Sequence, residues 1–300
     1  MSTPGNDREV RFGLVGTGYW AREVHARGVM GHPQATLVAV WGRDPDKASS
    51  LAAEHDAESY TDFDAMLESV DVLAFAVPPD VQAPLAVRAA RTGKHLLLEK
   101  PVALDAAAAD EVAEAVASAG VASIVFFTER FVPERERWLQ GLASLDCLGG
   151  RADWLASLRT PGNPFAGSAW RQESGALWDV GPHALSVLIP VLGPVVSVAG
   201  AHGRDDLVHL VLTHKGGATS TAHLSLTMPP DATRSGLTFY DATGWHERPE
   251  VESDAVEVHT GAVGELVELV RDGRTEHRCD AAFGAQVVRA LEQAQQLLRH

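Results

Sequence analysis

Two short motifs, far apart in the chain, carry residue types that suit redox chemistry. A turn of the GxGxxA type places its backbone against a dinucleotide pyrophosphate, and an ammonium that ends a later strand lies where doubly wound sheets bind ligands. The turn is Gly16, Thr17, Gly18, Tyr19, Trp20 and Ala21, and the later motif is Glu99 and Lys100 before Pro101. Together the two motifs predict hydride transfer to or from a nicotinamide cofactor.

The glycine-rich turn has the surroundings that the dinucleotide fingerprint requires. It follows an apolar run at 10–15 and opens a helical pattern. Gly16 suits the tight turn, Gly18 lets the backbone approach the pyrophosphate, and Ala21 permits close packing of the helix on the strand. The alternative is a structural connection without a ligand.

The choice between NAD and NADP is read at the end of the second strand. An NAD site places an acidic residue there to bind the ribose hydroxyls. This chain has Gly42 and Arg43 instead, and a small residue beside a guanidinium accommodates a 2′-phosphate. We therefore expect NADP, with NAD as the alternative, and we interpret Asp44 before Pro45 as a helix cap.

Several residues at strand ends complete the expected cofactor site. Pro78 closes the third strong apolar run, and Tyr19 and Trp20 are expected to cover the cofactor. The predicted cofactor-binding residues are Gly16, Thr17, Gly18, Tyr19, Trp20, Ala21, Gly42, Arg43, Pro78, Glu99 and Lys100.

The elements that must hold these motifs alternate between strand and helix in the first part of the chain, which favours a parallel sheet covered by helices. Expected strands are 10–15, 36–41, 70–77, 94–98 and 121–127, with helices at 21–30, 45–55, 81–92 and 105–118. From about Thr128 the pattern changes to alternating runs, which predicts a mostly antiparallel sheet. These runs are 151–159, 195–201, 207–214 and 218–228, with helices at 181–192 and 283–298.

The fold class predicted is α/β, with a Rossmann-type doubly wound parallel sheet and a second α/β domain with a mostly antiparallel open sheet. We expect the dinucleotide-binding domain at 1–126 and a substrate-binding and oligomerisation domain at 127–300, whose final helix packs back on the first.

Composition excludes several classes of function. A net charge of −15 disfavours a nucleic-acid partner, and the two cysteines are too few for a disulfide framework or a zinc site. The thirteen histidines show no metal-ligand spacing, so no metal is expected. The polar N-terminus and the lack of a long apolar run predict a cytoplasmic protein without a membrane span.

The motifs together resemble the Gfo/Idh/MocA oxidoreductase family. The resemblance rests on the glycine-rich turn, on 76–79, on Gly93 to Pro101, and on 174–183, which is similar to the glycine-rich DxGxH motif of that family. Val77, Gln82, Glu173 and Ser186 depart from the usual pattern, and none of them removes a proposed catalytic group.

This resemblance implies that Lys100, Asp179 and His183 line the site where nicotinamide meets substrate. Lys100 would hydrogen-bond the reacting hydroxyl and His183 would move its proton. Asp179 lies four positions before His183, so its carboxylate could orient the imidazole or a sugar hydroxyl. Without the resemblance, Lys100 would be interpreted as a solvated lysine, Asp179 as a helix cap and His183 as a histidine at the start of a helix.

Further residues are candidates for the substrate pocket. Trp170 and Arg171 end a loop that begins at Thr160, and an aromatic face beside a guanidinium suits a polyhydroxylated ring. Arg130 matches another family position, although a structural ion-pair role fits it equally.

The activity expected is NADP(H)-dependent oxidation or reduction at a secondary alcohol or ketone of a sugar, cyclitol or related polyol. The alternatives are a catalytically silent NAD(P)-sensing regulator and a reductase of a non-sugar ring such as a dihydrodiol. We expect a homodimer or homotetramer formed through the second-domain sheet, because an exposed apolar sheet face otherwise favours aggregation.

Overall fold

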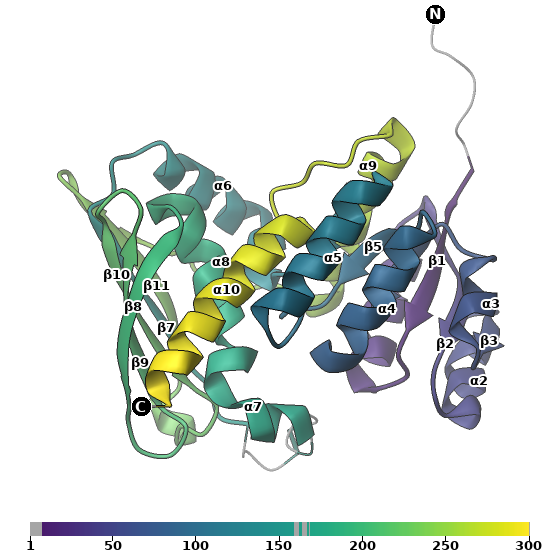
Figure 1. The fold of residues 1–300 in the computed structure, drawn as a ribbon, viewed down its shortest axis with the longest axis horizontal. Helices are drawn as coiled ribbons and strands as arrows, with labels where there is room; N and C mark the ends of the chain where they lie inside the picture. The colour runs from purple at the N-terminus through teal and green to yellow at the C-terminus, as the bar shows by residue number, and fades with distance from the viewer. Residues whose placement is uncertain (1–7, 159–161, 164–166, 168, 300) are drawn as a thin grey trace, which may run out of the picture. The chain divides into compact units, whose positions relative to one another are not determined.

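The computed structural model describes residues 8–158, 162, 163, 167 and 169–299 (Figure 1). Contacts divide the chain into two compact units. The first comprises Met1–Ala103, Ala107–Phe131 and Ser253–Ala285, and the second comprises Leu104–Ala106, Val132–Glu252 and Gln286–His300. Each unit has its own six-stranded sheet.

The sheet of the first unit is parallel throughout, in the order β3-β2-β1-β4-β5-β6. Its strands are β1 (Val10–Val15), β2 (Ala35–Trp41), β3 (Glu58–Tyr60), β4 (Val72–Phe75), β5 (His95–Leu98) and β6 (Ser123–Val125). Every residue of β4 is buried, as expected for a strand covered on both faces. This strand order is that of a dinucleotide-binding sheet and confirms the predicted fold class.

Helices of the first unit begin at recognisable caps. The carboxylates of Asp44, Asp62 and Asp254 accept backbone N–H groups at the starts of α2, α3 and α9. These helices are η1 (Ala21–Ala26, π-helical), α1 (Arg27–Met30), α2 (Pro45–Ala53), α3 (Phe63–Leu67), α4 (Pro79–Arg91), α5 (Ala106–Ala119), η2 (Thr128–Phe131) and α9 (Ala255–Asp272). α9 packs on η1, α1 and η2, so a late segment of the chain completes the first unit.

The second unit is built on a mixed, mostly antiparallel sheet in the order β12-β11-β7-β10-β9-β8. Its strands are β7 (Gly149–Leu155), β8 (Val195–His202), β9 (Val208–His214), β10 (Thr219–Ser225), β11 (Arg234–Asp241) and β12 (Gly244–Glu247). The pairing of β7 with β10 is parallel and the other four pairings are antiparallel.

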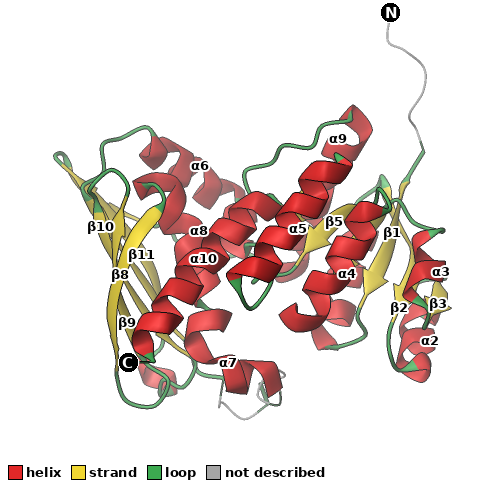
Figure 2. Ribbon diagram, in the orientation of Figure 1, coloured by secondary structure: helices red, strands yellow, loops and turns green. Residues whose placement is uncertain are grey.

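Helices lie on one side of this second sheet, and Figure 2 shows its other side bare of helices in the part of the chain that is described. The helices are α6 (Pro133–Ala143), α7 (Ala169–Asp179), α8 (Gly181–Leu192), η3 (Pro230–Ala232) and α10 (Ala281–Leu298), of which α10 begins in the first unit. Three residues of β9 that are not buried alternate with four that are, so every second side chain of that strand faces away from the helices.

The helices and strands expected from the alternating pattern are present, with ends that differ by a few residues. The pattern missed β3, α3, α6, α7, α9, β11 and β12, and the short helices η2 and η3. By length and composition the stretch Trp170–Leu192 would pass for a membrane-crossing helix, but 78% of its most apolar part is buried inside the chain, as in a core helix.

Candidate active site

The glycine-rich turn connects β1 to the helix that begins at Tyr19. Gly16 has φ 128°, and a Cβ there would lie 2.5 Å from the carbonyl oxygen of Ala76, so only glycine fits. A Cβ at Gly18 would meet no atom within 4 Å, and Ala21 is fully buried. The turn therefore combines a fixed backbone with open space at Gly18, as a pyrophosphate cradle requires.

The end of β2 lies beside this turn. Gly42 is buried, and a Cβ on it would lie 2.7 Å from Cγ2 of Thr17. Arg43 is exposed. Asp44 accepts the N–H groups of Asp46 and Lys47 at 3.1 and 3.2 Å, and the bond from Lys47 lowers the pKa of its carboxyl. Asp44 is thus the helix cap that the sequence indicated.

The Glu99 carboxylate joins the turn to the lysine motif. Oε1 of Glu99 accepts the indole N–H of Trp20 at 2.7 Å and lies 2.9 Å from Nε2 of His25. Oε2 accepts the backbone N–H of Lys100 at 3.1 Å. Two motifs that are distant in sequence are therefore adjacent in the first unit. Both carboxylate oxygens of Glu99 bond to protein groups.

The backbone of Glu99 is held from its other side by Gln82 on α4. The fully buried Gln82 amide donates to the Glu99 carbonyl at 2.8 Å and accepts the Glu99 N–H at 2.8 Å. Pro78, three residues after the end of β4, is the N-cap residue of the same helix. Sequence reasoning noticed Gln82 only as a departure from the family pattern; a polar residue on the apolar face of a helix was the signal that could have found it.

The second unit carries the other proposed catalytic residues on α7 and α8. Asp179 is 5% exposed and its Oδ2 accepts Nε of Arg171 at 3.0 Å, while the Arg171 guanidinium lies 4.9 Å from the Trp170 ring centroid. Gly175, at φ 66° and ψ −169°, interrupts α7 and separates the segment of Trp170 and Arg171 from that of Asp179.

His183 lies in the first turn of α8 and is partly exposed. Its ring stacks on Trp154 of β7, with centroids 5.9 Å and planes 13° apart. The alternating pattern predicts Trp154 in a strand. The contact with His183 could not be predicted, because stacking between a strand and a helix does not change the periodicity of either element.

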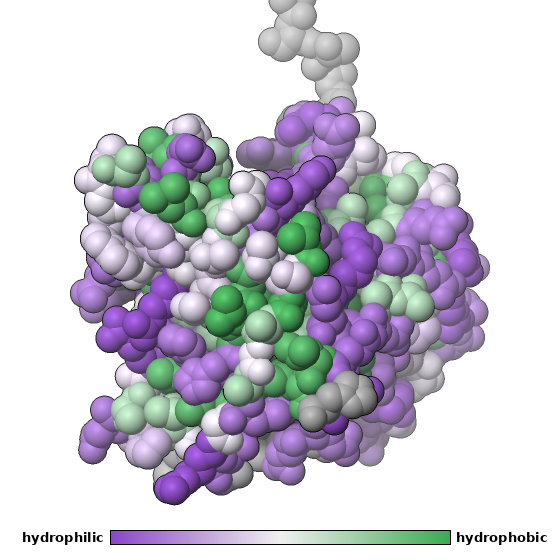
Figure 3. Space-filling view, turned by 60° about the vertical axis from the view of Figure 1, so that its left-hand side comes forward, coloured by the Kyte–Doolittle hydropathy of each residue, from purple (hydrophilic) through white to green (hydrophobic). Residues whose placement is uncertain are grey.

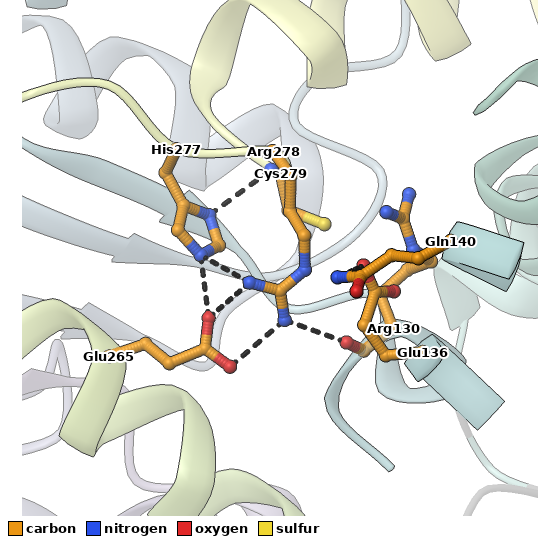
Figure 4. Close-up of polar contacts among 7 residues, drawn as sticks. All are labelled: Arg130, Glu136, Gln140, Glu265, His277, Arg278 and Cys279. Atoms are coloured by element: carbon orange, nitrogen blue, oxygen red, sulfur yellow. Dashed lines mark hydrogen bonds and ion pairs between the residues drawn. The ribbon is translucent and has the colours of Figure 1, made fainter. Parts of the chain in front are cut away.

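Arg130 is 4% exposed, and its guanidinium carbon lies 5.9 Å from the centroid of the Phe283 ring. Its backbone carbonyl accepts Nη2 of Arg278 at 2.8 Å, and Figure 4 shows Arg278 between this carbonyl and Glu265. This packing favours the structural alternative for Arg130 over a substrate contact.

No cluster of three or more metal-ligating side chains occurs among the described residues. The predicted loop from Thr160 to Arg171 lies partly outside the described residues, and its end was predicted wrongly, because Trp170 and Arg171 lie in the first turn of α7.

Comparison with known proteins identifies the family. Residues 10–127 match the model described as oxidoreductase family, NAD-binding Rossmann fold, and residues 151–245 match the GFO/IDH/MocA C-terminal domain. The chain belongs to the Gfo/Idh/MocA oxidoreductase family. It is accordingly an NAD(P)-dependent oxidoreductase by family, as the motifs predicted.

Named members of the Gfo/Idh/MocA family resemble the chain over different lengths. It is 27% identical to dTDP-3,4-didehydro-2,6-dideoxy-alpha-D-glucose 3-reductase of Streptomyces antibioticus, covering 88% of this chain and 85% of that protein. It is 37% identical to inositol 2-dehydrogenase of Rhizobium meliloti (strain 1021), covering 41% of this chain and 38% of that protein. The WlbA dehydrogenase of Bordetella pertussis, solved with NADH and UDP-GlcNAcA, has the same fold, with a TM-score of 0.84 and 21% identity over 99% of this chain and 97% of that one.

The proposed site residues thus form two groups. In the first unit, the glycine-rich turn and the Glu99 and Lys100 motif are joined through Trp20, and Gly42 packs against the turn. In the second unit, Arg171 and Asp179 are paired and His183 is stacked on Trp154. The joint action of Lys100 and His183 on one reacting group remains our proposal.

Proposed function

We propose that the protein is an NADP(H)-dependent oxidoreductase that transfers a hydride to or from a secondary alcohol or ketone of a sugar, cyclitol or related polyol. The observation that carries the proposal is the 2.7 Å hydrogen bond from Trp20 to Glu99, because it links the cradle at Gly18 to the lysine that follows Glu99. The cofactor fingerprint and the proposed catalytic ammonium therefore belong to one assembly.

A bound nicotinamide would supply the hydride chemistry, and the residues of this chain would supply binding and proton transfer. The turn at Gly16 and Gly18 would hold the pyrophosphate. As an alcohol carbon loses its hydride, Lys100 would stabilise the negative charge developing on the alcohol oxygen, and His183 would accept the hydroxyl proton. In the reverse direction His183 returns that proton to the ketone oxygen.

The preference for NADP is supported by the end of β2. Gly42 is buried against Thr17, the exposed Arg43 is available to a 2′-phosphate, and Asp44 is committed to capping α2. NAD sites use an acidic residue here to bind the ribose hydroxyls, whereas this chain has the guanidinium of Arg43.

A polyhydroxylated substrate is supported by two kinds of observation. The named relatives act on a dideoxy sugar nucleotide and on inositol, according to their names. In this chain, Trp170 and Arg171 present an aromatic face beside a guanidinium, and Asp179 adds a carboxylate that bonds hydroxyl groups well.

The test is a turnover assay in which NADP or NAD is offered with each member of a panel: D-galactose, myo-inositol, scyllo-inositol and a dihydrodiol. We expect reduced NADP to accumulate with a sugar or cyclitol. Activity with the dihydrodiol alone would favour the non-sugar reductase. Binding of NADPH without turnover on any compound would favour the regulator.

The open side of the second sheet supports pairing with a second copy of the chain. Val196, Val211 and Trp245 are exposed by 53%, 48% and 71%, and Figure 3 shows hydrophobic patches among the hydrophilic surface. We propose a homodimer or homotetramer through this sheet. Gel filtration of the Val211→Glu variant tests it: a smaller particle than the wild type is expected, and a monomeric wild type at micromolar concentration contradicts it.

A cytoplasmic location is part of the same proposal. Cys147 and Cys279 are both buried as free thiols, which suits a reducing compartment. Cell fractionation tests this directly, and recovery of the protein in an extracellular fraction contradicts it.

A further inference from the structure

Two buried histidines lie side by side behind the Glu99 and Lys100 motif. His25 on η1 and His259 on α9 are both fully buried, and their ring centroids are 4.2 Å apart. Both rings also meet Phe126 edge-on. A Cβ at Gly28 would collide with His259, so α1 approaches α9 closely at this point. All of these residues belong to the first unit.

The two rings differ in their polar contacts. Nε2 of His25 lies 2.9 Å from Oε1 of Glu99. Within the described part of the chain, Nδ1 of His25 and both nitrogens of His259 have no hydrogen-bond partner. Burial holds the pKa of His259 well below its ordinary value, so the His259 ring is neutral.

The proton on His25 can be placed from its partner. An ionised carboxylate accepts hydrogen bonds and donates none, so the imidazole must carry its proton on Nε2 to bond Glu99. Trp20 donates to the same carboxylate oxygen at 2.7 Å. Oε1 therefore receives two donors from one helical segment, and this fixes the plane of the carboxylate.

The other carboxylate oxygen holds the lysine. Oε2 of Glu99 accepts the backbone N–H of Lys100 at 3.1 Å. A continuous chain of hydrogen bonds thus runs from His25 through Glu99 to the backbone of Lys100. A small rotation of the carboxylate would release that N–H and move the Lys100 ammonium. Misplacing a catalytic group by about 1 Å lowers catalytic rates strongly.

We propose that His25 is a positioning residue for the reaction: its Nε2–H orients the Glu99 carboxylate, which in turn holds Lys100 at the place from which its ammonium reaches the reacting oxygen. His259 packs against His25 and keeps water from the Glu99 bond without taking part in the chain of hydrogen bonds. This inference rests on the proposed function, because it gives Lys100 a role in catalysis.

The test compares side chains that differ in where they place a donor. Glutamine places its amide nitrogen near the position of Nε2, whereas the amide of asparagine ends one carbon short. His25→Gln should therefore keep the bond to Glu99 and His25→Asn should lose it. The matched controls are His259→Gln and His259→Asn, which alter the same buried ring pair but touch no bond to Glu99.

Two measurements are made on each variant of the full chain. The first is kcat and KM with NADP and the alcohol of the panel that reacts. The second is hydrogen exchange of the peptide that contains the Lys100 amide. We expect His25→Asn to lower kcat about 10- to 100-fold with KM for NADP nearly unchanged, as for the loss of one charge-assisted bond. It should also speed exchange at Lys100, and His25→Gln should restore most of both.

The opposite results overturn the inference. If His25→Asn and His259→Asn lower kcat equally, or if His25→Gln is as impaired as His25→Asn, the pair serves packing alone. Should His25→Asn fail to fold, His25→Met replaces it, because methionine fills the volume without a donor. Lys100→Ala is measured in parallel. Full turnover in that variant would remove the proposed role of Lys100, and this inference with it. If Lys100→Ala loses turnover but the His25 and His259 variants lower kcat equally, only the inference is removed.

Discussion

The imidazole of His183 lies parallel to the indole of Trp154, with ring centroids 5.9 Å apart. The indole belongs to a strand and the imidazole to the first turn of a helix, so the stack ties the proposed proton carrier to the sheet of the second unit. Aromatic pairs of this kind contribute about 0.5 to 1.5 kcal/mol beyond the area they bury.

Replacing Trp154 by leucine should therefore release the ring of His183. We expect Trp154→Leu to lower kcat about 2- to 12-fold without changing the affinity for NADPH, since that is the change in rate to which a loss of about 0.5 to 1.5 kcal/mol of orienting energy corresponds. The comparison variant is Trp138→Leu, whose ring packs on Phe239 in the same unit. Equal losses of kcat in both variants would mean that the stack has no specific part in catalysis.

Gln82 is the residue whose loss should most affect the stability of the lysine motif. It is fully buried and bonds both the N–H and the carbonyl of Glu99. Gln82→Leu leaves both groups without that partner, which should lower the free energy of unfolding by about 2 to 4 kcal/mol. Urea unfolding measures this. Gln34→Leu, at an exposed position of the same unit, should change it by less than about 0.5 kcal/mol.

Arg43 should decide the choice of cofactor. Removing a guanidinium that bonds a 2′-phosphate should raise the Kd of NADPH about 10- to 100-fold in Arg43→Ala, and leave that of NADH nearly unchanged. Titration of cofactor fluorescence gives both constants. Lys47→Ala removes another exposed cation close by and should alter neither. A parallel weakening of both cofactors in Arg43→Ala would show that Arg43 does not read the phosphate.

Glu265 should make the first unit sensitive to acid. Burial alone would raise the pKa of this carboxyl, but hydrogen bonds from His277 and Arg278 outweigh burial and lower it from 4.5 to about 2 (Figure 4). Because the folded pKa lies below the unfolded one, the ionised carboxyl stabilises the fold above pH 4.5, and this contribution is lost as the pH falls towards 2.

The side chain of Glu265 is 35% exposed, so solvent screening reduces its contribution to about 1 to 2 kcal/mol. Unfolding curves recorded between pH 6 and pH 2 should show this loss in the wild type and a flatter profile in Glu265→Gln. Glu268→Gln, at an exposed position of the same helix, should follow the wild type. The same slope in wild type and Glu265→Gln would contradict the assignment.

The parallel sheet could be predicted from the sequence because each of its central strands is an apolar run followed by a helix with a clear start. β3 could not, since it is a three-residue edge strand with exposed residues. The membership of α9 in the first unit could not be predicted either: the predicted boundary treated everything after residue 126 as one domain, whereas Ser253–Ala285 returns to the first unit. A long-range return of the chain leaves no signal in local periodicity.

The candidate site was predictable where a backbone conformation demands a residue type. Gly16 is the clearest case, because its positive φ and the nearby carbonyl of Ala76 admit only glycine. The contacts of Gln82, His25 and Trp154 were not predictable, since each joins residues on different elements. Buried polar residues on apolar helix faces, such as Gln82 and His25, are the pattern to examine for such contacts.

The most direct test of the central claim is a double-mutant cycle of kcat with Lys100→Ala, His183→Ala and the double variant. If both side chains act on the same reacting hydroxyl, each single change lowers kcat by about 100-fold or more, and the double variant is little worse than the poorer single one. Losses that multiply in the double variant, or wild-type turnover in either single variant, would contradict the account.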